Sequence, residues 1–570
     1  MHYIDLAKTY EKLESTTKKL AKTEILANFL KTVPSEDLPK VVLLLLGKVF
    51  PPWAEQEIGV AQQMLIKTIA KTLGLSEHKV IEQFKKTGDL GNAIEILIKN
   101  KVQITLSKEE LTIEKVFDNF RQIAIQAGAG SQERKMALLA ELLTNAKPIE
   151  AKYICRTVLE QLRVGLAEGI LKDAIAQAFN VSPEEVENAW NFLPDYGEIA
   201  KIVAKQGAKG LQKIKLQIGL PCNVLLAEKA PDLKTALDSY ENVLLQYKYD
   251  GMRSLIHKKG EKIWIFTRRL EDVTNAFPDI VELAKKGLKA KEIIVDGETL
   301  GLDSKTGKPI PFQLLSTRIK RKYDIEKAIK EIPVQVNLFD ILYLDGKNLF
   351  DKPLRERFEI LKKNVCTVPN KFRIADSLET KNLEEADKFY KKALAEGHEG
   401  LIVKNLDALY VPGRSVAGGW LKVKPTLENL DLAIIGGIWG TGKRAGWIGS
   451  LILGARDSDT GEIKEIGMVG TGIKEKKIQP GDVTFAELTK MLKPLIIKEE
   501  GHTIWVKPKI IIEVSYEEIQ KSPTYASGFA LRFPRVIRLR LEKEEPDDLE
   551  RVKKIYEMQK GKEKKKTKLL

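Results

Sequence analysis

The chain has 570 residues, of which 43% are hydrophobic and 30% are charged, a balance typical of globular domains and unlike that of disordered chains. The formal net charge is 94 − 79 = +15, which favours polyanionic partners, nucleic acid above all. The three cysteines, Cys155, Cys222 and Cys366, form no CxxC pair, which argues against a disulfide framework and a cysteine-based zinc site.

The beginning of the chain has no apolar run of the signal-peptide type. The most apolar stretch, "VVLLLLGKVF" (41–50), contains Lys48 and is too short to span a bilayer, so it is predicted to be a buried helix. No membrane partner is expected, and the few cysteines fit a reducing cytoplasm.

Up to about residue 215, apolar residues recur at steps of three and four, which predicts a helical block. Two helix starts carry the S-x-x-E capping pattern, at Ser107 and at Ser182, and the second has Pro183 at the first helical position. The loop "GAGSQERK" (128–135) either presents backbone amides to a phosphate or forms an ordinary helix–helix turn.

Strand-like runs begin near Pro221 and alternate with polar helical stretches, which predicts a mixed α/β domain over 216–425. The runs are "KIWIFT", "EIIVDGE", "PVQVNLFDILYLDG", "GLIVKN" and "WLKVK". Over 426–550, short strands recur with glycine-rich turns, and a small β-barrel is the closed arrangement that suits them. Residues 551–570 are expected to form a short helix and a basic tail.

A lysine inside the apolar run "VLLQYKY" is the first candidate for chemistry. Lys248 is followed by Asp250 and Gly251 in "KYDGMR". A free lysine has a pKa of ~10.4, so a nucleophilic lysine needs burial or neighbouring cations to favour its neutral amine. Taken alone, the segment is more often a surface hairpin than a nucleophile.

Other charged residues fall at strand ends. In "VDGE", Asp296 and Glu298 lie on one face of a strand, two residues apart. Glu399 precedes the run "GLIVKN". In "WLKVK", Lys422 and Lys424 share a strand face, where two ammonium groups repel each other unless an anion lies between them. Each segment alone is also consistent with solvated surface residues.

Taken together, the order of six segments resembles the signature of ATP-dependent DNA ligases, within the covalent nucleotidyltransferase superfamily. These segments are "KYDGMR", "TRRLEDVTNAFPDI", "VDGE", "VNLFDILYLDG", "HEGLIVKN" and "WLKVK". The helical block, with "AKYICRTVLEQLRVGLAEGILKDAIAQAF", is similar to the N-terminal DNA-binding domain of the replicative ligases of archaea and eukaryotes.

The resemblance covers nearly the whole chain and implies a multidomain α+β fold. Its expected parts are an all-α DNA-binding domain (1–215), an α/β nucleotidyltransferase or adenylation domain (216–425), an OB-fold β-barrel (426–550), and a helical end with a basic tail (551–570).

The resemblance also implies a role for each matching residue. Lys248 would be adenylylated through a phosphoramidate bond, and Glu298 and Glu399 would bind the metal. The nucleotide-binding residues would be Gln246 at the adenine, Arg253 at the ribose or phosphate edge, Arg268 at a phosphate, Glu298 at the ribose hydroxyls, Phe339 stacked on the adenine, Lys422 and Lys424 at the α-phosphate, and Arg540 at the pyrophosphate. Gln246 stands where many relatives carry glutamate, and Glu542 stands where they carry aspartate in the R-x-D-K segment.

The implied activity is the sealing of nicks in duplex DNA in replication, repair and recombination. Lys248 attacks the α-phosphate of ATP, AMP moves to the 5′-phosphate of the nick, and the 3′-hydroxyl then displaces AMP. ATP would be the co-substrate and Mg²⁺ the cofactor, with Mn²⁺ as an alternative.

Nicked double-stranded DNA is the expected partner of a monomeric enzyme in the cytoplasm, associated with the nucleoid in a prokaryote. A sliding clamp is a further expected partner through "KVQITLSKEELT" (101–112), although this segment lacks the aromatic pair of relatives.

Two other function classes are consistent with parts of the sequence. An RNA ligase or a capping-type guanylyltransferase shares the lysine segment, but the long helical block speaks against it. A non-catalytic nucleic-acid-binding scaffold would form no covalent intermediate, and the lysines at 248, 422 and 424 speak against it.

Overall fold

The computed structural model describes residues 1–54, 56–99, 109–319, 321, 324–414, 419–425, 427–440, 444, 446–479 and 481–559. The chain divides into two compact units: Met1–Glu228 with Asp250–Asp376 and Asn405–Trp420, and Lys229–Tyr249 with Ser377–Lys404 and Leu421–Leu570. Within the described ranges, no helix is long and apolar enough to cross a membrane.

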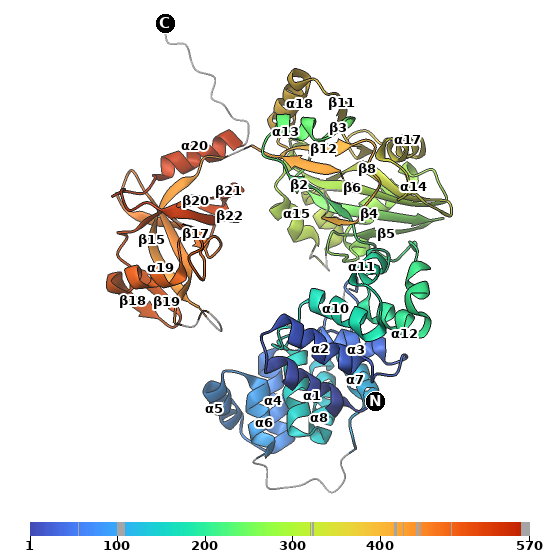
Figure 1. Ribbon diagram of the computed structural model, residues 1–570, viewed down its shortest axis with the longest axis vertical. Helices are drawn as coiled ribbons and strands as arrows, with labels where there is room; N and C mark the ends of the chain where they lie inside the picture. The colour runs from blue at the N-terminus through green and yellow to red at the C-terminus, as the bar shows by residue number, and fades with distance from the viewer. Residues whose placement is uncertain are drawn as a thin grey trace. The chain divides into compact units, whose positions relative to one another are not determined.

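The first unit begins with a helical region, drawn in blue to blue-green in Figure 1. Its helices are α1 (Tyr3–Glu14), α2 (Lys19–Leu30), α3 (Leu38–Leu45), α4 (Gln62–Leu73), α5 (Glu77–Thr87), α6 (Leu90–Lys99), α7 (Ile113–Ile125), α8 (Ser131–Asn145), α9 (Pro148–Val158), α10 (Glu168–Phe179), α11 (Pro183–Phe192) and α12 (Tyr196–Gln212).

The capping box predicted at Ser182 is confirmed. Its hydroxyl accepts a hydrogen bond from the Glu185 N–H at 3.1 Å, and the Glu185 carboxylate accepts one from the Ser182 N–H at 2.8 Å. Pro183 opens α11, where a missing N–H costs no intrahelical bond.

The helix start predicted at Ser107 is wrong. The residues from 109 to 112 are not helical, and Ser107 itself lies outside the described residues. Helix α7 begins at Ile113 because the Thr112 hydroxyl accepts a hydrogen bond from the Lys115 N–H at 3.1 Å.

The loop that precedes α8 has an anchor of its own. The Arg134 guanidinium donates hydrogen bonds to the carbonyl oxygens of Ala127 and Ala129, both at 3.0 Å. These bonds satisfy loop carbonyls as an ordinary turn requires. A phosphate at the start of α8 stays a prediction.

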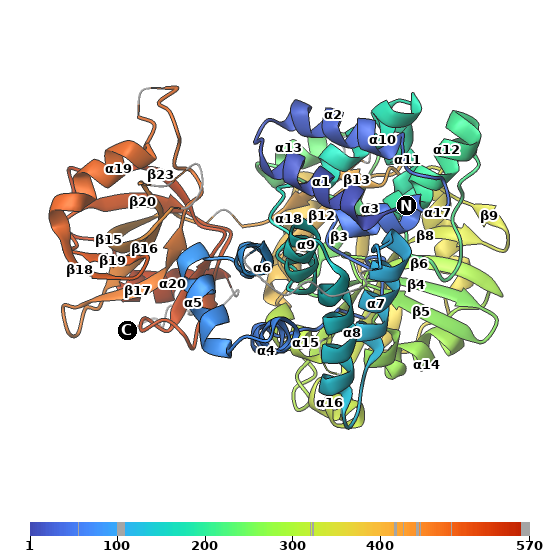
Figure 2. The same cartoon turned by 90° about the horizontal axis from the view of Figure 1, so that it is seen from below.

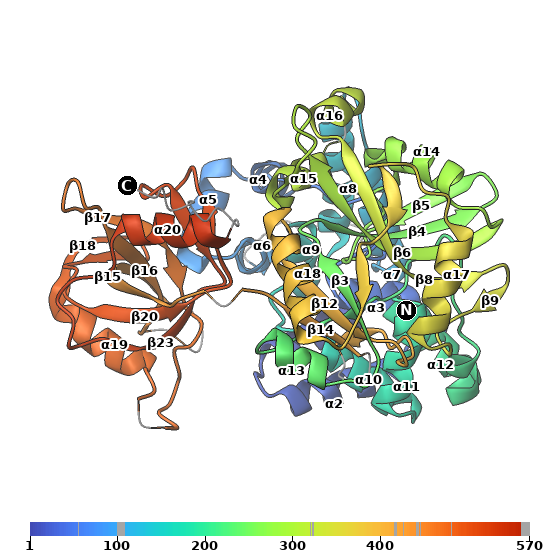
Figure 3. The same ribbon diagram turned by 90° about the horizontal axis from the view of Figure 1, so that it is seen from above.

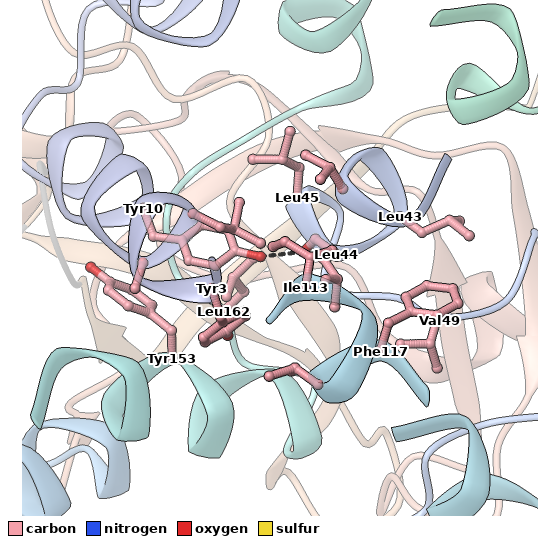
Figure 4. Close-up of a cluster of buried hydrophobic side chains, with 14 of the residues drawn as sticks. Tyr3, Tyr10, Leu43, Leu44, Leu45, Val49, Ile113, Phe117, Tyr153 and Leu162 are labelled. Atoms are coloured by element: carbon pink, nitrogen blue, oxygen red, sulfur yellow. Dashed lines mark hydrogen bonds between the residues drawn. The ribbon is translucent and has the colours of Figure 1, made fainter. Parts of the chain in front are cut away.

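The core of the helical region joins segments that are far apart in the sequence, as Figure 4 shows. The rings of Tyr10 and Tyr153 lie 4.9 Å apart, and the Tyr10 hydroxyl donates to the Leu44 carbonyl oxygen at 2.6 Å. Leu44 belongs to α3, in which residues 41–45 are all buried, so the predicted buried helix is confirmed for these residues, whereas residues 46–50 lie beyond the end of the helix.

The remainder of the first unit is built on a mixed sheet with the strand order β10-β8-β6-β4-β5; β7 pairs with β6 and β9 with β8. Its strands are β4 (Met252–Lys259), β5 (Lys262–Phe266), β6 (Glu292–Leu302), β7 (Pro309–Ile310), β8 (Val334–Leu344), β9 (Lys347–Asn348) and β10 (Phe372–Ile374). Strands β6 and β8 are buried along most of their length on both faces, which accounts for their nearly continuous apolar runs.

Helices cover this sheet, with α14 packed on β5 and α17 on β8, as Figure 3 shows. The remaining elements around it are η1 (Thr274–Ala276), α14 (Pro278–Gly287), α15 (Phe312–Ile319), α16 (Ile325–Glu331), α17 (Leu354–Asn364) and a short ribbon of β1 (Leu225–Leu226) with β13 (Gly413–Arg414).

A second sheet, with the strand order β11-β3-β12-β14-β2, lies mainly in the second unit. Its strands are β2 (Glu228–Lys229), β3 (Val243–Lys248), β11 (Ser377–Glu379), β12 (Gly400–Asn405) and β14 (Trp420–Val423), and its helices are α13 (Leu233–Asp238) and α18 (Leu383–Ala395). Three segments distant in sequence thus become neighbouring strands, β3, β12 and β14.

The second unit also contains a strand-rich C-terminal region centred on β15, which pairs with β16 on one edge and with β19 and β20 on the other. Helices α19 and α20 share its core (Figure 2). Its elements are β15 (Leu430–Trp439), β16 (Ile448–Arg456), β17 (Ile463–Val469), α19 (Phe485–Leu492), η4 (Lys493–Leu495), β18 (Ile496–Glu500), β19 (Thr503–Val506), β20 (Ile511–Ser515), β21 (Glu518–Lys521), β22 (Phe529–Arg532), β23 (Arg535–Leu539) and α20 (Leu549–Gln559).

The predicted fold class is therefore confirmed: a helical N-terminal region, a mixed α/β middle and a β-rich C-terminal region. The short helix expected near the C-terminus is α20, and the basic tail beyond it lies outside the described residues.

A buried ion pair fixes α17 on β8. Arg357 donates to both carboxylate oxygens of Asp340, at 2.8 and 3.0 Å, and the two side chains are 1% and 0% exposed. Removing the guanidinium leaves a buried carboxylate unpaired, which typically costs about 3–5 kcal/mol.

We therefore expect Arg357→Met to lower the free energy of unfolding by about 3–5 kcal/mol in urea denaturation. The matched control is Arg355→Met on the same helix. It breaks the exposed pair with Asp407 (2.9 Å) and should change stability by less than about 1 kcal/mol. Equal losses in the two variants would contradict the role given to the buried pair.

Candidate active site

Three charged residues meet at the ends of β3, β12 and β14. The Lys248 Nζ lies 2.5 Å from the Glu399 Oε2, and the Lys424 Nζ lies 2.7 Å from the same oxygen. We call these residues the lysine cluster. Glu399 is thus the anion between two ammonium groups, and the side chains are only 21%, 14% and 18% exposed.

Backbone geometry brings the lysine cluster together. The Glu399 N–H donates to the Lys248 carbonyl oxygen at 2.9 Å, which aligns the start of β12 with the end of β3. Gly400 has φ +141°, and a Cβ at this position would collide with the Val423 carbonyl oxygen. A glycine is therefore required for β12 to approach β14 this closely.

The charge of Glu399 is firmly fixed. Burial acts to raise the pKa of this carboxyl, but Lys248 and Lys424 together lower it to about 2. Glu399 is therefore an ionised oxygen donor at neutral pH, of the type that Mg²⁺ prefers. A more distant carboxylate, that of Glu517, lies 3.9 Å from the Lys424 Nζ and is 43% exposed.

Gln246 lies two residues before Lys248, on the same face of β3. Its side chain is 2% exposed, and neither Nε2 nor Oε1 has a hydrogen-bond partner among the residues that the structure describes. A buried amide without partners costs free energy, so this position is suited to a ligand that supplies both a donor and an acceptor.

In the first unit, Arg253 on β4 pairs with Asp296 on β6. The Arg253 Nε donates to Oδ1 and Nη2 donates to Oδ2, both at 2.5 Å, and Asp296 is fully buried. Although burial acts to lower it, Asp296 raises the pKa of the Arg253 guanidinium. The turn before β4 needs Gly251, because a Cβ there would collide with the Thr299 carbonyl oxygen.

Two aromatic rings flank this guanidinium. The Arg253 Cζ lies 4.7 Å from the ring centre of Phe339 on β8 and 5.5 Å from that of Trp420. Glu298 is the register partner of Arg253 on β6 and is half-buried. The structure thus brings three predicted residues, Arg253, Glu298 and Phe339, onto adjacent strands of one sheet.

The other predicted residues lie in three separate places. Lys422 is on β14, two residues before Lys424, and is half-buried. Arg268 is exposed on the turn after β5. Arg540 lies in the C-terminal region, where its ion pairs within the described chain are with Asp431, Glu513 and Glu542. The structure does not bring Arg540 into the lysine cluster.

Sequence reasoning missed three residues that hold these side chains. Asp431 accepts two bonds from the Arg540 Nη1 at 2.9 Å and also pairs with Lys543. Trp420 flanks Arg253, and Tyr410 donates to Asp296. The only sequence signal was that Trp420 opens the segment "WLKVK"; isolated aspartates and tyrosines carry none.

Within the described ranges, no group of three or more His, Cys, Asp and Glu side chains gathers as a metal site. A metal at Glu399 would thus take most of its ligands from phosphate oxygens and water, the usual arrangement for Mg²⁺.

Family models match along the chain. A model of the DNA ligase N terminus matches residues 2–176, one of the ATP dependent DNA ligase domain matches residues 224–424, and one of the ATP dependent DNA ligase C terminal region matches residues 444–543.

Several relatives match over nearly their full length. A DNA ligase of Nanoarchaeum equitans is 47% identical over 98% of this chain and 99% of its own. A DNA ligase of Thermococcus fumicolans is 46% identical over the same shares. The solved structure "Pmar-Lig_Pre." has a TM-score of 0.54 at 15% identity, over 94% of this chain and 99% of its own, which shows a shared fold.

Both kinds of comparison agree on the family: the family models together cover most of the chain, and two relatives are 46–47% identical over nearly their full length. The protein belongs to the ATP-dependent DNA ligase family, whose general activity is to seal nicks in DNA through an adenylate intermediate.

Proposed function

We propose that Lys248 is the residue through which this protein seals nicks in duplex DNA, in replication, repair and recombination. The observation that carries the proposal is the lysine cluster, in which two ammonium groups contact the same oxygen of Glu399. Phosphoryl-type transfer asks a protein mainly for positioning and for positive charge around the phosphate oxygens. The ammonium groups of Lys248 and Lys424, both within 2.7 Å of one oxygen of Glu399, supply such charge at one place.

The reaction proceeds in three displacements. The Lys248 amine attacks the α-phosphorus of ATP, an N–P bond forms, the bond to the leaving oxygen breaks, and pyrophosphate departs. The nick's 5′-phosphate oxygen then displaces the lysine and takes the AMP. Finally, the 3′-hydroxyl attacks the activated 5′-phosphate, the new phosphodiester forms, and AMP departs.

The lysine cluster sets the protonation of the nucleophile. Glu399 favours the charged form of Lys248 because it lies 2.5 Å away, whereas the charge of Lys424 opposes protonation. Attack requires the neutral amine, so the Glu399 carboxylate must turn to other partners when the nucleotide is bound. Lys422 and Lys424 then face the α-phosphate.

Three side chains bind the rest of the nucleotide in this proposal. Gln246 meets the adenine edge with its amide, which is otherwise without partners among the described residues. Arg253 reaches the ribose or phosphate edge through Nη1, the one guanidinium nitrogen that makes no hydrogen bond with a described residue. Phe339 stacks on the adenine.

Glu399 and Glu298 hold the divalent cation, for which we propose Mg²⁺ with Mn²⁺ as an alternative. The ionised carboxylate of Glu399 suits such a cation. When bound, the metal supplies positive charge to the phosphate oxygens. Arg268 and Arg540 contact phosphates farther along the triphosphate or the DNA.

Further parts of the proposal rest on the family resemblance and the charge of +15. The boundary between the DNA-binding and adenylation domains lies near residue 215, and the boundary between the adenylation and OB-fold domains lies near residue 425. The protein acts on nicked duplex DNA as a monomer, in the cytoplasm and at the nucleoid if the source is a prokaryote. A sliding-clamp contact would use residues 101–112, most of which lie outside the described residues.

Labelling with ATP carrying a radioactive α-phosphate tests the nucleophile. We expect the protein to gain the mass of one AMP and Lys248→Ala to gain none, because in this proposal the Lys248 amine is the atom that carries the AMP. Lys259→Ala is the matched control, since this lysine lies at the end of β4 and is 63% exposed. It should label like the wild type.

A second measurement separates charging from sealing. Lys248→Ala should still join a nick that already carries AMP on its 5′-phosphate, because that step does not use the lysine. Labelling of the alanine variant would contradict the proposal, and transfer from GTP but not from ATP would point to a capping-type enzyme instead.

Replacing the buried amide should separate stability from binding. Gln246→Leu removes two polar atoms without partners among the described residues, so the free energy of unfolding should stay equal or rise by about 1 kcal/mol. The KM for ATP in the charging step should nevertheless rise about tenfold, because one adenine contact is lost. The control is Gln335→Leu on β8, which should leave the KM unchanged. A Gln246→Leu variant with the wild-type KM would rule out the adenine contact.

Glu399→Gln keeps the shape of the side chain and removes its charge. We expect the rate of lysine adenylylation to fall at least about 100-fold and the Mg²⁺ concentration for half-maximal rate to rise. Chelation with EDTA should stop labelling in the wild type, and added Mg²⁺ should restore it.

The control is Glu517→Gln, which removes the other carboxylate near Lys424 but an exposed one, 3.9 Å away. It should change the rate less than about threefold. If Glu399→Gln reached its half-maximal rate at the same Mg²⁺ concentration as the wild type, Glu399 would be excluded as a metal ligand.

A further inference from the structure

A closed ring of hydrogen bonds links the Arg253 guanidinium, the Asp296 carboxylate, the Tyr410 hydroxyl and the backbone of Leu225. Its Nη2 donates to the Asp296 Oδ2 at 2.5 Å and to the Leu225 carbonyl oxygen at 3.3 Å. The Tyr410 hydroxyl donates to the same Oδ2 at 3.1 Å and accepts from the Leu225 N–H at 3.0 Å. Tyr410 therefore links the carboxylate to the backbone segment that also receives the guanidinium.

Both carboxylate oxygens of Asp296 accept hydrogen bonds in this arrangement. Its Oδ1 accepts from the Arg253 Nε, and its Oδ2 accepts from Nη2 and from Tyr410. Asp296 is 0% and Tyr410 3% exposed, so water does not compete for these bonds. In such surroundings a hydrogen bond to a charged group is strong, and the loss of one bond is not repaired by solvent.

Tyr410 is itself rigidly held. Its ring centre lies 4.7 Å from that of Phe350 and 5.5 Å from the Arg357 Cζ, and it meets Trp420 edge-on at 88°. Burial and the neighbouring Asp296 raise the pKa of its hydroxyl well above the ordinary value, so the hydroxyl remains a donor at every working pH.

The same elements fix the plane of the guanidinium. Phe339 and Trp420 flank it, and Nε and Nη2 are tied to Asp296. A planar group with two fixed nitrogens has no remaining freedom of rotation, so the direction of Nη1 is set as well. Within the described part of the chain, Nη1 makes no hydrogen bond, and its two donors are available to a ligand.

We propose that Tyr410 is a positioning residue for nucleotide binding: through Asp296 it holds Arg253 so that Nη1 points at the ribose or phosphate edge of ATP. The inference rests on the proposed function, because it requires Arg253 to contact the nucleotide. Tyr410 touches no reacting atom. It acts by keeping the guanidinium pre-organised, so that little conformational freedom is lost on binding.

The test is Tyr410→Phe, which removes only the hydroxyl. We expect the KM for ATP in the charging step to rise about tenfold and the kcat to stay within about twofold, because the contact binds substrate and transition state alike. The matched control is Tyr343→Phe on β8, whose hydroxyl donates to the Glu292 carboxylate at 3.3 Å in a more exposed setting. It should leave both constants within twofold. A merely structural role would lower stability without this separation of KM from kcat.

Two further variants show whether Tyr410 acts through Arg253. Asp296→Asn keeps the side-chain shape and should raise the KM at least as much as Tyr410→Phe. In an Arg253→Lys background, which keeps the positive charge but loses the planar fork, adding Tyr410→Phe should change the KM less than twofold. A full tenfold rise in that background, or a wild-type KM in Tyr410→Phe alone, would overturn the inference.

Failure of the proposed function is distinguishable from failure of this inference. If the wild-type protein never gains AMP at Lys248, the proposed function is wrong. If it does gain AMP, but Tyr410→Phe charges with wild-type kinetics, only the role of Tyr410 is wrong. Thermal unfolding of each variant, measured alongside, identifies any loss of the fold.

Discussion

Two ammonium groups contact one carboxylate at the ends of β3, β12 and β14, and the proposed chemistry depends on this arrangement. Lys248 and Lys424 both contact the same oxygen of Glu399, so two cations lie close together where all three side chains are largely buried. Two cations held this close repel each other, and a further anion relieves the repulsion. In the proposed function the nucleotide phosphate is that anion, and its arrival lets Glu399 bind the divalent cation in place of an ammonium group. The charge that attracts the substrate is therefore the same charge that disfavours a protonated nucleophile.

The number of hydrogen bonds that a buried side chain makes within the protein distinguishes structural residues from candidate ligand-binding residues. Asp296 is fully buried and both of its carboxylate oxygens accept hydrogen bonds, which is the pattern of a structural group. The amide of Gln246 is equally buried, yet it has no hydrogen-bond partner in the described part of the chain. Arg253 combines both patterns, with Nε and Nη2 committed and Nη1 available. A folded chain tolerates such incomplete groups because their partners arrive with the substrate.

The sequence was sufficient for the fold class, because long apolar runs such as that of β8 arise only where a strand is buried on both faces. It also indicated charged residues at strand ends, but their spacing alone gave no reason for Lys248, Glu399 and Lys424 to meet, and only the family resemblance implied a common nucleotide site. Their meeting depends on the order of β3, β12 and β14 in the sheet, which spacing along the chain does not encode. The role of Tyr410 is even harder to predict from the sequence, because a single tyrosine belongs to no recognisable pattern. The error at Ser107 has a local cause: a capping pattern nearby, at Thr112, starts the helix instead.

Arg540 matches a family pattern, yet it lies in the C-terminal region and not in the lysine cluster. Its Nε and Nη1 donate to Asp431, Glu513 and Glu542, beside a hollow of about 420 Å³ lined also by Lys543 and Arg551. To contact a pyrophosphate, Arg540 must exchange carboxylate oxygens for phosphate oxygens. The two kinds of charge-assisted hydrogen bond are similar in strength, so the exchange is nearly balanced in free energy. A nearly balanced exchange is easily reversed, which suits the role proposed for Arg540 in a step that ends in pyrophosphate release, because an arginine without internal carboxylates would retain that leaving group.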